Sequence, residues 1–249
     1  MTQDLSPLTR IPRTGLPACA LVVGDPARAE AVAGLLEDAE EVSHHRECRL
    51  FTGSWRGLRV TVASHGVGGP GAILLFRELA EAGVRTIVRL GTAGSIRPGI
   101  ADGDLVIAEG AVRDDGVTGQ LLPPEYPALC APEAVLALQR AAREAGVPHH
   151  RGIVWTRAAF QPGLIPVTAY GEAGVAAIEM ELSALLVTAS LRGLTAGGVL
   201  VADGANADDL VDEEATGGYD PHRQVVADGV RRGSVVALEA LRLLAEDGR

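Results

Sequence analysis

Short apolar runs and amphipathic stretches alternate along the chain. Runs of this length that are rich in Val, Leu, Ile and Ala are typical of buried strands. The clearest of them occupy residues 19–24, 59–66, 86–94, 104–112 and 196–203, and a weaker one occupies residues 150–156. Apolar residues at helical spacing predict helices over residues 28–37, 71–82, 132–145, 175–190 and 226–245.

This alternation of strands and helices predicts an α/β fold. It favours a mixed or mostly parallel central sheet that helices cover on both faces. No shift in composition marks a linker and no repeat is present, so we expect residues 1–249 to form a single domain.

Composition and charge limit the partners that the protein can bind. The chain is 47% hydrophobic but only 3% aromatic, so its core must be built from aliphatic side chains. The formal net charge of −10 disfavours nucleic acid and anionic membranes, because both would repel the chain. A small anion held by a local group of arginines is still compatible with that charge.

All 22 basic residues are arginine, and this excludes chemistry that depends on lysine. A Walker-A lysine and a Schiff-base lysine are both absent, so arginine, backbone N–H and hydroxyl groups must hold any phosphate. Cys19, Cys48 and Cys130 give neither a disulfide framework nor metal-ligand spacing. With no apolar signal core and no run near the ~20 apolar residues of a membrane span, we expect a soluble, cytoplasmic protein without a bound metal.

Glycine or polar residues end four of the predicted strands. They are Gly24, residues 64–66, residues 91–94 and residues 203–204. Ligands of open α/β sheets gather at the carboxyl ends of the strands. We therefore expect the functional site at this edge of the sheet.

Two of these strand ends carry candidate ligands for an anion. Arg89 lies inside an apolar run, where an arginine needs a partner, and Thr92 follows it closely. Arg28 lies one turn into the helix that follows Gly24. A bidentate anion clamp and an internal salt bridge both explain Arg89, and an ordinary surface position also explains Arg28.

The string GVGGPG at residues 66–71 matches the G-x-G-x-x-G pattern of dinucleotide sites. It follows a later strand rather than the first, Pro70 stands where the helix should open, and no acidic residue ends the next strand. We therefore favour a glycine-rich turn against which a ligand lies on bare backbone.

Three carboxylates are candidates for binding or proton transfer. Glu179 and Glu181 lie two apart in a predicted helix, so they point in different directions and only one of them suits a vicinal diol. A helix N-terminal position alone would also explain them. Asp203 ends an apolar strand, where it suits either proton donation to a leaving group or a simple turn.

Taken together, several strings resemble the nucleoside phosphorylase-I family, which includes bacterial hexameric purine nucleoside phosphorylase and uridine phosphorylase. They are GDPARA, VSHHRE, SHGVGGPG, VRLGTAGSI, GDLVIAEGAVRDDG, PPEYPA, AIEMELSAL and VADG, and they run in family order from about residue 20 to 205. The resemblance implies a mixed, partly barrel-like central sheet flanked by helices. It also implies cleavage of a ribonucleoside by inorganic phosphate to free base and ribose 1-phosphate, with no further cofactor.

The resemblance assigns roles to individual residues and implies a dimer-based homohexamer. Phosphate would be bound by Gly24, Arg28, Arg89 and Thr92, with Arg46 coming from the neighbouring subunit. The ribose would be bound by Met180 and Glu181. The base would be bound by Phe160, Gln161 and Asp203, where Asp203 is the proton donor and Arg223 is the nearest arginine that could support it.

The chain departs from the family pattern at several positions. Residues 1–17 lack the histidine that a neighbouring subunit usually brings to the 5′-hydroxyl. Glu47 matches a potassium site found at the dimer interface of some uridine phosphorylases, but Gly71 replaces the side-chain ligand. The stretch 43–127 favours uridine phosphorylase, whereas Asp203 favours purine nucleosides. We expect purine nucleosides to be preferred, because the residue that protonates the leaving group should decide. A nucleosidase and a non-catalytic nucleoside-binding protein are the alternatives.

Overall fold

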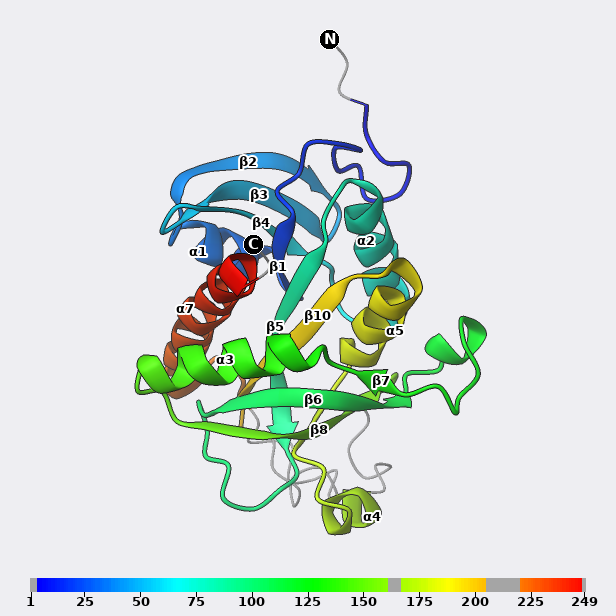
Figure 1. Cartoon of the computed structure of the whole chain (residues 1–249). Coiled ribbons are helices and arrows are strands. Elements are labelled where there is room, and N and C mark those ends of the chain that lie inside the picture. The colour runs from blue at the N-terminus through cyan, green and yellow to red at the C-terminus, as the bar shows by residue number, and fades with distance from the viewer. Residues whose placement is uncertain (1–3, 161–166, 205–219, 248–249) are drawn as a thin grey trace.

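The computed structural model describes residues 4–160, 167–204 and 220–247. Their strands form one mixed ten-stranded sheet in the order β10-β6-β8-β9-β5-β1-β4-β3-β2, with β7 beside β6 (Figure 1). Among the described residues, no helix is long and apolar enough to cross a membrane.

One part of the sheet closes into a five-stranded, barrel-like ring. β10 pairs with both β5 and β6, β8 pairs with β6 and β9, and β9 returns to β5. This confirms the mixed, partly barrel-like sheet. The strands of the ring are β5 (Thr86–Ser95), β6 (Leu105–Asp114), β8 (His149–Arg157), β9 (Ala177–Glu179) and β10 (Thr195–Ala202).

The rest of the sheet extends outward from β5. β1 (Cys19–Val23) lies parallel between β5 and β4 (Leu58–Ser64), and β3 (Cys48–Trp55) and β2 (Glu37–His45) follow as an antiparallel ribbon. β7 (Ala128–Leu129) is a short addition to β6.

Helices cover both faces of the central strands β5 and β10. Figure 1 shows α7 on one side of these strands and α2 with α5 on the other. α3 packs against α7 and the ring strands. The helices are α1 (Pro26–Ala33), α2 (Gly69–Glu81), α3 (Pro132–Glu144), α4 (Val167–Glu172), α5 (Leu182–Arg192) and α7 (Gln224–Asp247), with one 3-10 turn at Thr118–Gln120.

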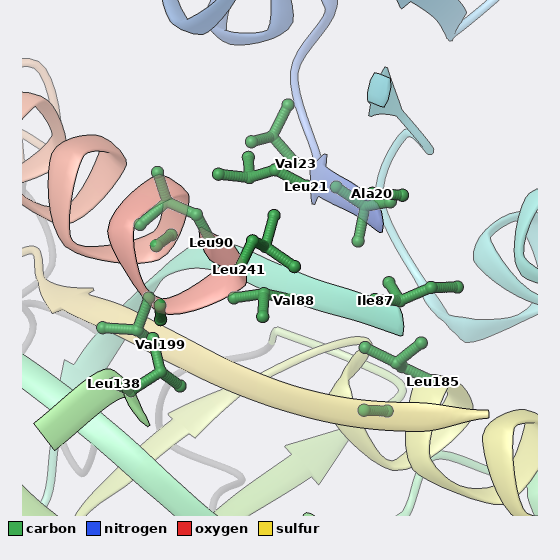
Figure 2. Packing of buried hydrophobic residues seen from close by; sticks show 14 of the residues in the cluster. Ala20, Leu21, Val23, Ile87, Val88, Leu90, Leu138, Leu185, Val199 and Leu241 are labelled. Carbon is green, nitrogen blue, oxygen red and sulfur yellow. The ribbon is translucent and has the colours of Figure 1, made fainter. Parts of the chain in front are cut away.

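The core is aliphatic, as the composition predicts. Side chains from the strands interdigitate with helix side chains on both sides of the sheet (Figure 2). The labelled members are Ala20, Leu21 and Val23 of β1, Ile87, Val88 and Leu90 of β5, Val199 of β10, Leu138 of α3, Leu185 of α5 and Leu241 of α7. Gly198 lets α5 approach β10, because an ideal Cβ there would lie 2.7 Å from Leu182 Cδ1 of α5.

Two predictions of secondary structure are wrong. The predicted helix over 175–190 begins instead as strand β9, and α5 starts only at Leu182. The predicted helix over 28–37 ends at Ala33, and β2 and β3 were missed. β2 is largely exposed and rich in Glu, so its sequence lacks the alternation by which a half-buried strand is recognised.

Candidate active site

A cavity of about 660 Å³ lies beside the ends of β1, β8, β9 and β10 and the second half of β5. This is the edge of the sheet at which the sequence predicted a site. Eight of the predicted site residues line the cavity: Gly24, Arg28, Arg89, Thr92, Phe160, Met180, Glu181 and Asp203.

The first corner of the cavity is the junction of β1 and α1. The Asp25 side chain accepts a hydrogen bond from Ala27 N at 2.9 Å, and Pro26 occupies the first turn, where no N–H is needed. Arg28 therefore stands one turn into a well-defined helix. Burial, and next the positive charge of Arg89, lower the pKa of Arg28. The two positively charged guanidinium groups therefore repel each other, and a bound anion would stabilise both charges.

Arg89 lies at the centre of the sheet, between Val22 of β1 and Gly198 of β10. Its Nη1 lies 3.2 Å from Glu179 Oε2, and its Nη2 contacts Glu181 Oε2. The internal salt bridge is therefore present. Its Nε nevertheless has no hydrogen-bond acceptor among the described residues, and its Nη1 meets Glu179 as an ion pair without hydrogen-bond geometry. Buried donors of this kind are rare in native proteins and point to a ligand.

Gly91 makes room for this guanidinium group. An ideal Cβ at position 91 would lie 2.2 Å from Arg89 Nη1 and 2.8 Å from Arg89 Cζ. No side chain fits there while Arg89 keeps its ion pairs, so the glycine of this strand serves Arg89 directly.

We predicted that Glu179 and Glu181 lie in one helix and point in different directions, and this prediction is wrong. Glu179 ends β9 and caps α5, since it accepts hydrogen bonds from the backbone N–H groups of Glu181 and Leu182 at 2.8 and 2.9 Å. It also accepts from the Thr156 hydroxyl. Burial raises the pKa of Glu179.

Glu181 is the second carboxylate partner of Arg89. Its Oε1 accepts a hydrogen bond from Gly68 N at 2.6 Å. Burial by itself would raise the pKa of Glu181, but Arg89, His65 and the Gly68 N–H together lower it. Glu181 is therefore an ionised acceptor held against the cavity, and the turn at residues 66–68 is tied to it.

Asp203 directly follows β10 and is buried in the cavity wall. Its N–H donates to Ala93 O at 3.1 Å. Arg223 does not line the cavity: its Nη2 binds Asp102 Oδ2 at 2.6 Å and reaches the Asp203 carbonyl oxygen at 3.5 Å. The support of the Asp203 carboxylate by Arg223 stays a prediction.

The remaining predicted residues lie elsewhere. Arg46 is exposed in the turn between β2 and β3 and does not line this chain's cavity. Gln161 lies outside the described residues. Glu47 lines the cavity, and an ideal Cβ on Gly71 would lie 3.9 Å from its Oε1. The described residues contain no cluster of three or more His, Cys, Asp or Glu side chains suited to a metal.

Sequence reasoning missed two residues of this region. Arg157 ends β8 and lines the cavity. An arginine at the end of an apolar strand was the signal available. His65 is fully buried, and burial, then Arg89, lower its pKa to about 4. Its Nδ1 pairs with Gly66 O at 2.7 Å, so the imidazole is neutral with the proton on Nδ1.

The family model described as the phosphorylase superfamily matches residues 18–242. The chain belongs to this superfamily. It is 36% identical over 240 residues to a uridine phosphorylase of Thermococcus kodakarensis, which covers 91% of this chain and 82% of the relative. It is 34% identical over 188 residues to a purine nucleoside phosphorylase of Plasmodium vivax, with 74% and 77% covered.

A solved structure is also similar over nearly the whole length of this superfamily member. Purine nucleoside phosphorylase from Toxoplasma gondii in complex with immucillin-H superposes with a TM-score of 0.91 at 31% sequence identity. The match covers 99% of each chain.

Proposed function

We propose that this protein is a nucleoside phosphorylase that prefers purine nucleosides. Inorganic phosphate attacks C1′ of the ribose, the C1′–N bond breaks, and the products are a free base and ribose 1-phosphate. The observation that carries the proposal is the group of unsatisfied Arg89 donors in a cavity that also contains Arg28 and two ribose- or base-directed carboxylates, Glu181 and Asp203. Relatives named purine nucleoside and uridine phosphorylases support it.

Phosphate takes the end of the cavity beside β1 and β5. The backbone of Gly24, the guanidinium groups of Arg28 and Arg89 and the Thr92 hydroxyl supply donors on several sides. Holding the phosphate in line with C1′ lowers the barrier mainly through positioning and electrostatics.

The ribose lies against Met180 and Glu181, next along the sheet. Glu181 is ionised and anchored by Gly68 N and Arg89, so its remaining lone pairs face a ligand in fixed positions. They accept hydrogen bonds from the 2′- and 3′-hydroxyls. Cleavage makes the ribose positively charged, and both the bound phosphate and Glu181 stabilise that charge.

The base lies beside Phe160 and Asp203, and Gln161, which is outside the described residues, is the further candidate that the family pattern gives. Negative charge grows on the base as the bond breaks, and the Asp203 carboxyl group transfers its proton to the base to neutralise it. Phe160, with 47% of its surface exposed, contacts the face of the base at the cavity mouth. Arg223 steadies Asp203 through the backbone carbonyl that it approaches.

We further propose a homo-oligomer, a hexamer built from dimers, in which Arg46 completes the neighbouring phosphate site. Its exposed position outside its own cavity supports this arrangement. Cys19, Cys48 and Cys130 are free buried thiols, which suits the reducing cytoplasm. The proposed activity would give the protein a role in nucleoside salvage. A potassium ion at the dimer interface would use Glu47 as a ligand. One carboxylate per chain, opposite Gly71, does not make a potassium site by itself. No step of the proposed reaction depends on a potassium ion.

A panel of nucleosides, each assayed for free base with and without phosphate, tests the proposal. We expect phosphate-dependent release of hypoxanthine from inosine that exceeds release of uracil from uridine. The reverse ranking would make the protein a uridine phosphorylase, which the 36% identical relative favours. Full activity without phosphate would make it a nucleosidase.

The variant Asp203→Ala separates an enzyme from a binding protein. An enzyme loses purine turnover with this substitution but still binds the nucleoside. If the wild-type protein binds nucleosides and cleaves none, the phosphorylase proposal is wrong.

A further inference from the structure

The turn between β2 and β3 has a strained backbone at Arg46. The turn consists of Arg46 and Glu47, and it joins the paired residues His45 and Cys48. Arg46 has a φ of 55°, in the left-handed region that favours glycine. Another residue keeps such a conformation only where the surrounding structure holds it, and strain of this kind is concentrated at functional sites. The contacts that hold this turn therefore bear on function.

The side chain of Ser64 is one of these contacts. Ser64 is the last residue of β4 and is fully buried. Its hydroxyl group accepts a hydrogen bond from Arg49 N at 2.9 Å and donates one to Glu47 O at 2.5 Å. One hydroxyl group therefore spans the end of the turn and fixes the peptide group that follows Glu47. Without it, a buried donor and a buried acceptor next to the strained residue would both lose their partner.

Gly66 brings the same turn against the strand ends that carry the proposed phosphate site. An ideal Cβ on Gly66 would lie 2.6 Å from Glu47 Cγ, so a residue without a side chain is needed for this approach. Gly66 N also donates to Gly24 O at 2.9 Å. Residues 64–66 therefore hold both the turn that carries Arg46 and the Gly24 corner of the cavity.

The side chain of Arg49 ties the base of the turn to two further elements. Its Nη1 binds Glu30 Oε2 of α1 at 2.7 Å, and its Nη2 binds Glu41 Oε2 of β2 at 2.8 Å. Arg46 itself is exposed and lies outside the cavity of its own chain. A turn that is held firmly at its base thus presents a charged side chain at the surface. Groups held in this way cost little to position when they bind a ligand.

We propose that Ser64 is a positioning residue for the phosphate site of the neighbouring subunit, because its hydroxyl group fixes the turn from which Arg46 enters that site. This inference rests on the proposed function and on the shared site that is part of it. Ser64 does not line the cavity of its own chain, so it acts through Arg46 and not by touching a substrate. A guanidinium group binds phosphate through donors in fixed directions, so its contribution depends on the orientation of the turn.

The first test compares Ser64→Ala with Thr61→Val. Each substitution removes one buried hydroxyl group from β4, but the Thr61 hydroxyl bonds Pro17 O at 3.4 Å, away from the turn. We expect KM for phosphate to rise by about 10- to 100-fold in Ser64→Ala, as when a positioning group is misplaced, while KM for the nucleoside changes little. Thr61→Val should match the wild type. Ser64→Cys keeps a weak donor, should give an intermediate KM, and replaces Ser64→Ala if the latter does not fold.

The second test shows which subunit Ser64 serves. Ser64→Ala and Arg28→Ala chains are assembled together in equal amounts and assayed at a phosphate concentration below the wild-type KM. In a mixed dimer, the cavity of the Ser64→Ala chain keeps its own Arg28 and receives Arg46 from a chain with an intact Ser64. This mixture should recover about a quarter of the wild-type activity, since half of the dimers are mixed and each has one intact site. A general loss of folded protein would give no such recovery.

The matched control for this mixture is Ser64→Ala assembled with Arg46→Ala. Both substitutions act on the neighbouring site under our proposal, so each mixed dimer has two damaged sites and should recover nothing. Arg46→Ala assembled with Arg28→Ala tests the shared site without Ser64.

An unchanged KM for phosphate in the Ser64 variants overturns the inference. It is also wrong if Arg46→Ala recovers activity with Arg28→Ala but Ser64→Ala does not, because Ser64 would then serve its own chain. Wild-type activity of Arg46→Ala removes the shared site and this inference with it, and leaves the phosphorylase proposal intact. If no nucleoside is cleaved with phosphate, the proposed function fails as well.

Discussion

Arg89 and Glu181 form an ion pair inside the cavity wall, with their side chains only 4% and 7% exposed. Glu179 takes the other terminal nitrogen of the same guanidinium group, at 3.2 Å. One cation thus holds two buried carboxylates, one that caps α5 and one that faces the ligand. The same residue therefore supports both the fold and the proposed phosphate site.

Replacing Arg89 by Met should destabilise the protein strongly. The variant keeps much of the side-chain volume but leaves Glu179 and Glu181 buried without their cation. We expect the free energy of unfolding to fall by about 3–5 kcal/mol, as when one partner of a buried ion pair is removed. Urea unfolding measures this change. Arg85→Met is the control, because Arg85 is exposed and, among the described residues, its side chain hydrogen-bonds carbonyl oxygens only; a similar loss there would contradict the argument.

Replacing Gly91 by Ala should harm catalysis, and it should also lower stability because it displaces Arg89 from its ion pairs. The new Cβ would lie 2.2 Å from Arg89 Nη1, so the guanidinium group must move away from its present position. A shift of this size in a positioning group costs on the order of 100-fold in rate. We expect kcat/KM for phosphate to fall accordingly in a steady-state assay.

Gly119→Ala is the matched control for this substitution. An ideal Cβ on Gly119 meets nothing within 4 Å, and Gly119 does not line the cavity. Its kinetic constants should match those of the wild type. Equal activity of Gly91→Ala and Gly119→Ala would show that Arg89 does not need its present position.

The sequence was sufficient to locate the site because its signals are local. Gly24, Arg89 and Asp203 each interrupt or end an apolar run, and strand ends of such a sheet meet at one edge. The same logic would have found Arg157 had it been applied to the weaker strand at 150–156. Resemblance to a family was needed to connect these residues to phosphate and a nucleoside.

The conformation around Glu179 and Glu181 could not be predicted in this way. Residues 175–190 have a helical composition, but β5 and β8 pair with residues 177–179 and hold them extended. Tertiary pairing therefore overrides local preference. β2 escaped prediction for the opposite reason, since its exposed Glu-rich sequence becomes a strand only through pairing with β3.

The buried His65 should make the fold less stable in mild acid. Burial, then the charge of Arg89, lower its pKa to about 4, whereas its ordinary value is 6.5. Between these pH values the unfolded chain binds a proton that the folded protein does not. The contribution of His65 is therefore complete above pH 6.5 and is lost as the pH falls toward 4, by about 3 kcal/mol.

The variant His65→Asn isolates this effect. Asn keeps a donor near the position of Nδ1 for Gly66 O but does not titrate. Urea unfolding from pH 7 to 4 should give a shallower loss of stability for the variant than for the wild type. Glu181 and Glu179 titrate in both proteins, so their contributions largely cancel in the difference. Parallel curves would mean that His65 binds a proton equally well in the folded protein.

The shared site can be tested by mixing two damaged chains. Arg46→Ala should damage the site of the neighbouring subunit, and Arg28→Ala should damage the site of its own chain. In a dimer of the two variants, one site then carries both substitutions and the other carries neither. Each variant alone should have low activity, and equal amounts assembled together should recover about a quarter of the wild-type activity, since half of the dimers are mixed and each has one intact site.

Arg28→Ala mixed with Thr92→Val is the matched control. Arg28 and Thr92 line the same chain's cavity, so a mixed dimer of these variants has no intact site and should recover nothing. Recovery in the first mixture alone would show that Arg46 acts across the interface. Wild-type activity of Arg46→Ala by itself, or equal recovery in both mixtures, would instead show that each cavity is complete within one chain.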